Sequence, residues 1–329
     1  MKNENITSDE FRSLSESIIS QVKRVIVGQH ELIELTMVTL LAGGNALLEG
    51  VPGLGKTILV RTLAQAIHCK FSRIQFTPDL MPSDIVGTNL VVENEDGRRQ
   101  FQFEAGPIFA NLVLADEINR ATPKTQSAML EAMQEHSVTV AKVTRPLPEP
   151  FIVLATQNPL EMEGTYPLPE AQLDRFFFKI DVPYPEFGEL VEIANRTTTP
   201  LMPQAEPVAE ASTVTDMQML ARGLPIAPHV TEYAANLVKS THPNTPSCPP
   251  EVAKYVRYGA SPRAMQAMIL AGKILALLDS RYNVSYEDLR RAALPAMRHR
   301  IILNFEAQAE GITTDRVILK LLESLPVEA

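Results

Sequence analysis

Residues 50–57 read Gly-Val-Pro-Gly-Leu-Gly-Lys-Thr, and this stretch decides the fold that the rest of the chain is expected to adopt. The stretch matches a known pattern in which two glycines, separated by four residues, are followed by a lysine and then by a serine or threonine. Glycine lets backbone amides turn toward an anion, and the helix that follows adds a partial positive charge. The Lys56 ammonium can reach the β- and γ-phosphates of a nucleotide, and the Thr57 hydroxyl can bind Mg²⁺. The stretch therefore predicts a phosphate-binding loop, or P-loop, for ATP.

The residues around this loop provide the context that a phosphate site requires. An apolar run at residues 45–50 is typical of a buried strand, and residues 56–67 have helical spacing. A chance glycine turn, the other explanation, would not need that context. From residue 45 to about residue 182, strand-like and helical segments alternate, which is the pattern of a parallel α/β sheet. The other expected strands are residues 72–76, 112–115, 138–143, 151–155 and 176–180, and further helices are expected at residues 8–27, 31–42 and 124–135.

The periodicity changes after residue 185, and we expect a domain boundary there. Residues 1–185 are expected to form a nucleotide-binding α/β domain, and residues 186–329 a second domain built of helices. Within the first domain, residues 88–103 hold two β-prone arms around a polar centre, which predicts a hairpin. The helices expected in the second domain are residues 187–197, 215–223, 231–240, 262–279, 286–297 and 315–323.

Composition argues against several classes of protein. The 329-residue chain has a net charge of −9, which disfavours a nucleic-acid binder held by a broad basic surface. No apolar segment reaches the roughly 20 residues of a membrane span, and the polar first residues do not resemble a signal peptide. Cys69 and Cys248 are too few for a disulfide framework or a structural zinc site. We expect a cytoplasmic protein.

Two of the expected strands lead into polar side chains that suit hydrolysis of ATP. The apolar residues 111–115 precede Asp116 and Glu117. Asp116 can hold Mg²⁺ at the carboxyl end of the strand, and Glu117 can act as a general base toward the attacking water. The apolar residues 151–155 lead to Asn158, whose amide can hydrogen-bond the γ-phosphate and orient the water. By spacing alone, Asn158 is explained equally well as a turn-former before a proline.

The order of these motifs resembles the AAA+ ATPases, and several phrases closely resemble the MoxR group among them. The resemblance covers nearly the whole chain, is most specific over residues 45–180 and is looser in the C-terminal part. It implies a three-layer α/β/α P-loop NTPase fold with a parallel sheet and a C-terminal all-helical lid. The phrases are residues 117–126 (Glu-Ile-Asn-Arg-Ala-Thr-Pro-Lys-Thr-Gln), 130–135 (Leu-Glu-Ala-Met-Gln-Glu), 156–159 (Thr-Gln-Asn-Pro) and 164–176 (Gly-Thr-Tyr-Pro-Leu-Pro-Glu-Ala-Gln-Leu-Asp-Arg-Phe).

The resemblance also implies how the nucleotide is held. Residues 56–57 resemble the Walker A pair, and residues 116–117 resemble the Walker B pair. Residues 27–29, Val-Gly-Gln, resemble the segment that lines the adenine pocket. Thr57 and Asp116 are the expected magnesium ligands. The expected ATP-binding residues are Val27, Gly28, Gly50, Gly53, Leu54, Gly55, Lys56, Thr57 and Ile58.

Three further catalytic roles are implied by the resemblance. Asn158 resembles sensor 1, Arg175 resembles the arginine finger that reaches the γ-phosphate of a neighbouring subunit, and Arg263 resembles sensor 2 on the lid. Without the resemblance, either arginine would be interpreted as a solvated or salt-bridged surface charge. An arginine supplied by a partner has a physical rationale, because it stabilises the charge that develops in phosphoryl transfer and makes turnover depend on assembly.

The basic residues 298–300, Arg-His-Arg, are interpreted as charge favoured at the end of a helix.

The resemblance implies an assembly and a type of work. It implies a homo-oligomeric, hexameric ring with sites between subunits, in which hydrolysis of ATP to ADP drives chaperone-like remodelling or maturation of a partner protein. Such partners often carry a von Willebrand A domain, and metal-cofactor insertion is sometimes involved. The hairpin at residues 88–103 matches an insertion in helix 2 that is shared with magnesium-chelatase ATPase subunits. The resemblance also implies that residues 135–150 hold a second hairpin, which precedes sensor 1.

Other functions remain open from the sequence. One is a magnesium-chelatase-like or DNA-acting motor subunit, although the acidic composition disfavours a nucleic-acid partner. Another is a nucleotide-gated scaffold that binds ATP with little hydrolysis. Glu117 and Asn158 argue against the scaffold, since a protein that only binds ATP needs neither a base nor a water-positioning amide.

Overall fold

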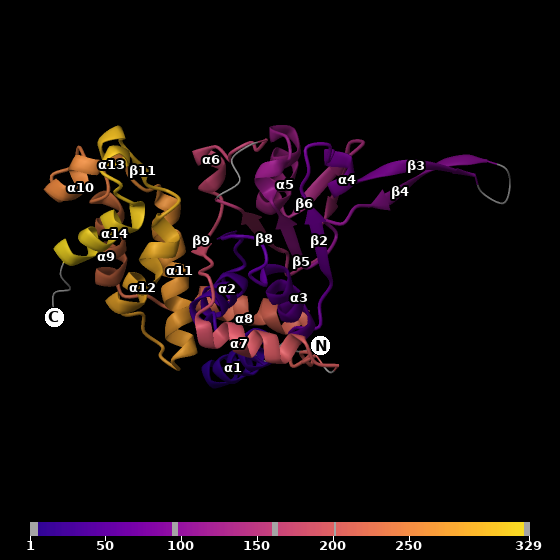
Figure 1. Ribbon diagram of the computed structural model, residues 1–329, viewed down its shortest axis with the longest axis horizontal. Helices are drawn as coiled ribbons and strands as arrows, with labels where there is room; N and C mark the ends of the chain where they lie inside the picture. The colour runs from indigo at the N-terminus through magenta and orange to yellow at the C-terminus, as the bar shows by residue number, and fades with distance from the viewer. Residues whose placement is uncertain (1–5, 94–97, 160–163, 201, 326–329) are drawn as a thin grey trace.

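The computed structural model describes residues 6–93, 98–159, 164–200 and 202–325, and a five-stranded parallel sheet lies at its centre (Figure 1). The strand order is β2-β5-β8-β1-β9, and every neighbouring pair is parallel. The three central strands are almost wholly buried, as expected for parallel strands with both faces covered. The strands are β1 (Ala46–Glu49), β2 (Phe71–Gln75), β5 (Leu112–Asp116), β8 (Ile152–Gln157) and β9 (Phe178–Asp181).

Helices cover both faces of this sheet, which confirms the predicted three-layer α/β/α arrangement (Figure 1). Because successive side chains of a strand point to opposite faces, Leu112 and Leu114 join one core and Val113 joins the other. The helices are α1 (Ser8–Val25), α2 (His30–Ala42) and α3 (Lys56–Ala66) on the first face and α4 (Pro82–Val86) and α5 (Pro123–Glu135) on the second.

The C-terminal part of the chain forms a group of helices at one end of the molecule (Figure 1). A short antiparallel ladder of β10 (Val256–Tyr258) and β11 (Ile302–Leu303) lies within the group, so the part predicted to be all-helical also holds two short strands. No helix in the described ranges is long and apolar enough to cross a membrane. The helices of the group are α9 (Pro228–Lys239), α10 (Pro250–Tyr255), α11 (Pro262–Leu278), α12 (Tyr286–Met297), α13 (Phe305–Ala309) and α14 (Thr314–Ser324).

Two helices that follow the predicted domain boundary pack with the first helical layer. They are α7 (Phe187–Thr197) and α8 (Ala211–Gly223). The Gln218 amide of α8 donates to the Leu40 carbonyl of α2 at 2.8 Å, and Arg196 of α7 donates to the carbonyl of Arg24 at the end of α1 at 3.0 Å. Both helices thus extend the layer of α1 to α3. The domain boundary predicted at residue 186 stays a prediction. The helices that lie outside this layer come after that residue in the chain.

The single strand that the residue pattern predicted at residues 138–143 is wrong in detail, because a small hairpin lies there, as the resemblance implied for residues 135–150. Its strands are β6 (Ser137–Val140) and β7 (Val143–Pro146). The turn between them places Ala141 and Lys142 at φ values of 50° and 67°. Left-handed residues in such turns are usually glycine or asparagine, so the sequence carries no cue for this turn. Short helices that the sequence analysis did not single out are η1 (Ile118–Arg120), α6 (Glu170–Leu173), α10 and α13.

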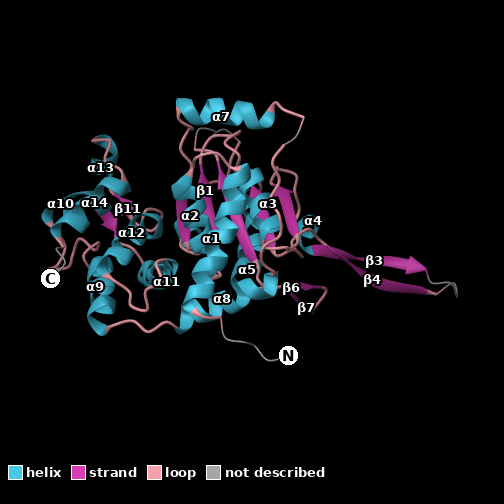
Figure 2. Cartoon of the chain, turned by 90° about the horizontal axis from the view of Figure 1, so that it is seen from below, coloured by secondary structure: helices cyan, strands magenta, loops and turns pink. Residues whose placement is uncertain are grey.

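A longer hairpin projects from the body of the molecule, as predicted (Figure 2). It consists of β3 (Gly87–Glu93) and β4 (Arg99–Ala105), and its predicted turn at residues 94–97 lies outside the described residues. The Arg145 guanidinium of β7 lies 3.8 Å from the centre of the Phe103 ring of β4, and it donates to the Val143 carbonyl at 3.1 Å. This stacking joins the base of the long hairpin to the small one.

The base of the long hairpin has no room for a side chain at its glycines. A Cβ added to Gly106 would lie 2.2 Å from the Ile85 carbonyl oxygen and 2.5 Å from the Gly87 nitrogen. Because both neighbours are backbone atoms, Gly106→Ala is expected to lower the free energy of unfolding by about 1–3 kcal/mol, measured by denaturant titration. Gly223→Ala is the control, since no atom lies within 4 Å of its added Cβ. Equal stability of the two variants would contradict the close approach.

Candidate nucleotide site

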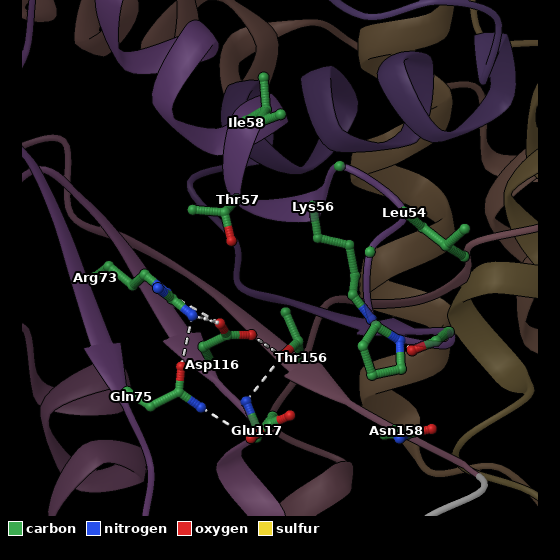
Figure 3. A pocket seen from close by; sticks show the side chains of 14 residues that line it. Leu54, Lys56, Thr57, Ile58, Arg73, Gln75, Asp116, Glu117, Thr156 and Asn158 are labelled. Carbon is green, nitrogen blue, oxygen red and sulfur yellow. Dashed lines mark hydrogen bonds and ion pairs between the residues drawn. The ribbon is translucent and has the colours of Figure 1, made fainter. Parts of the chain in front are cut away.

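The predicted phosphate loop lies between the end of β1 and the start of α3, at the carboxyl edge of the sheet (Figure 3). Gly53 and Gly55 have φ values of 84° and 79°, and a Cβ on either would meet nothing within 4 Å. These glycines are therefore required by the backbone conformation rather than by space. Beside the loop is a cavity of about 340 Å³. Its lining includes Gly50, Gly53, Leu54, Gly55, Lys56, Thr57, Ile58, Asp116, Glu117, Thr156 and Asn158.

Lys56 begins helix α3 and points back along its own loop. Its ammonium donates to the Gly50 carbonyl. Burial lowers the pKa of Lys56, although the carboxylates of Asp116, Glu117 and Glu49 act in the opposite direction. The carbonyl is a neutral acceptor that a phosphate oxygen can replace with a stronger, charge-assisted bond. Lys56 is thus placed to change partners when an anion enters the cavity.

The acidic pair stands at the end of β5, where neighbouring strands fix both carboxylates (Figure 3). One oxygen of Asp116 accepts from the Thr156 hydroxyl at 2.6 Å, and the other accepts from Arg73 Nη2 at 2.6 Å. The same Thr156 oxygen accepts from the backbone N–H of Glu117 at 2.8 Å. Glu117 has a φ of 56°, which turns its side chain out of the strand direction.

Glu117 is held by a second set of contacts from β2 and η1. Its Oε2 accepts from the Gln75 amide at 2.8 Å and forms an ion pair with Arg120 at 3.3 Å. The Arg73 guanidinium also donates to the Gln75 side-chain oxygen at 2.6 Å. Arg73 and Gln75 therefore link the two carboxylates through one chain of hydrogen bonds.

The structure brings ten of the predicted site residues together at this cavity, and five of them have polar side chains. These five are Lys56, Thr57, Asp116, Glu117 and Asn158. Asn158 follows β8 and is 7% exposed, which places its amide among the other lining groups. Ile58 also lines the cavity, but its side chain points away from the acidic pair and is 49% exposed (Figure 3).

The segment predicted to line the adenine pocket lies beside the loop and does not line this cavity. The Gln29 side chain donates to the Leu54 carbonyl at 3.2 Å, which ties the segment to the loop. Gly28 has a φ of 62°, and a Cβ there would lie 1.7 Å from a carboxylate oxygen of Glu189 on α7. Gln29 therefore contacts the loop, Gly28 lies close to Glu189 of α7, and neither Val27 nor Gly28 lines the cavity.

The two predicted arginines lie at the opposite edge of the sheet from the loop. Arg175 and Arg263 line a second cavity of about 280 Å³ together with residues 43–45, which precede β1. The phosphate loop follows β1, and a four-residue strand spans about 13 Å. Arg175 Nη1 donates to the Leu130 carbonyl at 3.2 Å, and Arg263 pairs with Asp174 at 3.2 Å. Neither guanidinium therefore belongs to the cavity of its own phosphate loop.

A magnesium site in this arrangement rests on few protein ligands. Among the described residues, no group of three or more histidine, cysteine or acidic side chains is placed to hold a metal ion. Mg²⁺ does not need such a cage, because it keeps several waters and binds phosphates with one or two protein oxygens. Thr57 and Asp116 supply two such oxygens on the same cavity. The residues present therefore fit the ion.

Comparison with known proteins agrees with this geometry. Residues 45–178 match the ATPase family associated with various cellular activities (AAA), and residues 251–321 match the AAA lid domain. The chain is 44% identical to Chaperone MoxR1 of Mycobacterium tuberculosis, over 94% of this chain and 81% of that protein. It is 30% identical to protein MoxR of Paracoccus denitrificans, over 93% and 94% of the two chains. A crystal structure from Cytophaga hutchinsonii, named a "putative ATPase", superposes with a TM-score of 0.91 at 40% identity, covering 98% of this chain and 97% of the other.

Proposed function

This chain belongs to the MoxR family of AAA+ ATPases, and from that premise we propose that it uses magnesium-dependent ATP hydrolysis to remodel or mature a partner protein. The observation that carries the proposal is the convergence of Lys56, Asp116, Glu117 and Asn158 on one cavity beside the phosphate loop. A site that only bound nucleotide would need neither Glu117 nor Asn158. The chain accordingly binds nucleotide as an AAA+ ATPase, and the roles below extend that activity.

We assign one task to each group in the cavity. Lys56 leaves the Gly50 carbonyl for the β- and γ-phosphates. Thr57 and Asp116 would hold Mg²⁺, which would supply positive charge to neutralise the phosphates. Glu117 accepts a proton from the attacking water, and Asn158 orients that water by a hydrogen bond. Nε and Nη2 of Arg73 both donate to Oδ2 of Asp116, so an ion bound at that oxygen would have to share it with Arg73 or displace Arg73.

Removal of the metal gives a test of the magnesium site. A chelator is expected to reduce hydrolysis to background, and added Mg²⁺ should restore it, because the transferred phosphoryl group otherwise carries unneutralised charge. Asp116→Asn is expected to raise the Mg²⁺ concentration needed for half-maximal turnover by about tenfold or more, since one anionic ligand is lost. Asp216→Asn on α8, outside the cavity, is the matched control. An unchanged Mg²⁺ requirement in Asp116→Asn would remove Asp116 from the metal site.

We propose that the site is completed by a second copy of the chain. Arg175 and Arg263 line one cavity at the far edge of the sheet, which supports a role at a neighbour's nucleotide rather than at their own. The surface of α7 supports assembly, because its exposed side is apolar and its inner side is polar. Phe187 is 84% exposed and Val191 47%, while Glu189 and Arg196 face the body. A ring, a hexamer by family resemblance, would bury such a surface.

The work done on a partner is proposed from the relatives and from the long hairpin. The M. tuberculosis relative is named a chaperone. In the hairpin, Val91 lies directly opposite Phe101, and these side chains are 58% and 78% exposed. Such a projecting apolar pair is suited to contact with another protein. We propose a client or adaptor, with a von Willebrand A domain as the first class to examine and metal-cofactor insertion as one form of maturation.

The partner can be captured with a variant that binds ATP without cleaving it. Glu117→Gln is expected to retain protein partners in the presence of ATP and Mg²⁺ and to lose them without ATP. Lys56→Ala, which lacks the phosphate-binding ammonium, is the control and should capture none. A partner bound equally by both variants would contradict ATP-dependent remodelling.

A further inference from the structure

The segment that carries Arg175 is held by the C-terminal helices. The Arg300 side chain, just beyond the end of α12, is 2% exposed and lies against residues 174–177. Its Nε donates to the Asp174 carboxylate at 2.9 Å. Its Nη2 donates to the carbonyls of Asp174 and Phe176, and its Nη1 donates to the carbonyls of Phe177 and Ala296. A guanidinium has five N–H groups, and each of the five has an acceptor here, four of them on this one segment.

Asp174, the residue before Arg175, is a second attachment point. Its carboxylate also accepts from the Ser261 hydroxyl at 2.5 Å and from Arg263 at 3.2 Å, both at the start of α11. Burial raises the pKa of Asp174, but the Ser261 hydroxyl and Arg300 outweigh it, so the pKa lies below its usual value. The carboxylate therefore stays charged at neutral pH and keeps all three contacts.

The residue after Arg175 is fixed in the same way. The Phe176 ring is fully buried, and its carbonyl accepts from His299 Nε2 at 3.0 Å as well as from Arg300. Arg175 itself is exposed. The backbone on either side of Arg175 is thus held from the C-terminal helices, while its exposed side chain has one contact, with the Leu130 carbonyl of α5.

We propose that Arg300 is a positioning residue for ATP hydrolysis, which fixes the segment 174–177 to the C-terminal helices and so directs Arg175 toward the nucleotide of the neighbouring subunit. This inference rests on the proposed role of Arg175 in the neighbour's site. It assigns a function to Arg300, one of the basic residues 298–300 that the sequence suggested were only charge at a helix end. It also means that the C-terminal helices and the arginine move as one body.

A purely structural contact is the competing explanation, and Arg298 offers a matched comparison. Arg298 is also largely buried, with its side chain 11% exposed. It pairs with Asp181 of β9 at 2.8 Å and with Asp315 of α14 at 2.7 Å. It therefore joins the same two parts of the chain without touching residues 174–177.

Mixed rings separate the two explanations. An Arg175→Ala subunit keeps an intact phosphate loop, and a Lys56→Ala subunit keeps an intact Arg175. In a mixed ring, a site is therefore active only where Arg175 of a Lys56→Ala subunit reaches the nucleotide of an Arg175→Ala subunit. Arg300→Gln is placed either in the Lys56→Ala subunit, which supplies the arginine, or in the Arg175→Ala subunit, which does not. In the first placement we expect kcat to fall about 10²-fold, because a shift of about 1 Å in a catalytic group has that effect. In the second placement kcat should stay near that of the mixture without Arg300→Gln. The KM for ATP should be unchanged in both placements.

The possible results each decide the matter. Equal losses in the two placements would show a structural role alone and overturn the proposal. No recovery in the parent mixture would overturn the shared site itself, so the two failures are distinguishable. Arg300→Lys keeps the charge but has three donors in place of five, and it should show the same dependence on placement with a smaller loss, even where Arg300→Gln does not fold. Arg298→Gln should give no dependence on placement.

Discussion

Glu117→Gln is expected to lower the turnover of ATP by about 10²–10⁴-fold while nucleotide binding persists, because the amide cannot accept a proton from water. The change preserves shape, and the amide oxygen still accepts the hydrogen bond that Gln75 now donates to Glu117. Loss of activity would therefore report loss of the base rather than collapse of the site. Turnover is measured by phosphate release, and binding by titration with a fluorescent nucleotide.

A matched acid away from the cavity serves as the control for this change. Glu232 lies on α9 and is exposed, so Glu232→Gln should leave both turnover and binding unchanged. If Glu117→Gln hydrolyses ATP at the parent rate, Glu117 is not the base. If it loses binding as well, the hydrogen-bond chain through Gln75 and Arg73 supports the loop more than it supports catalysis.

Arg175→Ala is expected to lower turnover about 10³-fold or more in a ring of identical subunits, the effect usually seen when an arginine supplied in trans is removed. Nucleotide affinity should change little, because Arg175 lies at the other edge of the sheet from its own phosphate loop. Lys56→Ala should also be inactive, in this case through loss of phosphate binding. Mixing the two inactive proteins should restore activity at sites that combine an intact loop with an intact arginine.

The controls for this experiment exclude an effect of charge alone. Arg12 is an exposed arginine of α1 that pairs with Glu16, so Arg12→Ala should behave as the parent protein does. Activity retained in Arg175→Ala would exclude this residue from the reaction. Two inactive variants that fail to restore each other would indicate that no site is shared.

The phosphate loop and the acidic pair were predictable because each is a local pattern. The glycines of residues 50–57 indicate by themselves a loop whose backbone needs conformations that favour glycine. Asp116 and Glu117 come at the end of an apolar run of strand length. The fold followed from the alternation of such runs with helical segments. For these features, neighbours in the sequence are also the neighbours that matter in space.

The contacts that hold the acids were not predictable, because they depend on strand order. Arg73 and Gln75 reach Asp116 and Glu117 because β2 lies beside β5, with Gln75 in register with Asp116. Nothing in the sequence of β2 indicates which strand will be its neighbour. Thr156 on β8 enters the network for the same reason, from the other side of β5.

Arg300 was misinterpreted for a related reason. Its main partner, Asp174, lies 126 residues earlier in the chain. A short basic cluster after a helix has an ordinary explanation in the helix dipole, and only the packed structure shows a buried guanidinium with every donor used. The sequence likewise did not predict that the apolar side of α7 faces outward. The spacing of its apolar residues fits a helix whichever side faces the body.

The long hairpin has the geometry of a lever. Strand β3 has seven residues, which at about 3.4 Å each give an arm of about 24 Å from its base to Glu93. The close approach at Gly106 fixes the base itself, and the Arg145–Phe103 stacking joins that base to the small hairpin, so a rotation of the base would move the whole arm. A rotation of about 10° at the base would displace Glu93 by about 4 Å, on the order of one residue step along an extended chain. Small angular changes near the sheet would thereby give a displacement as long as one residue of an extended polypeptide.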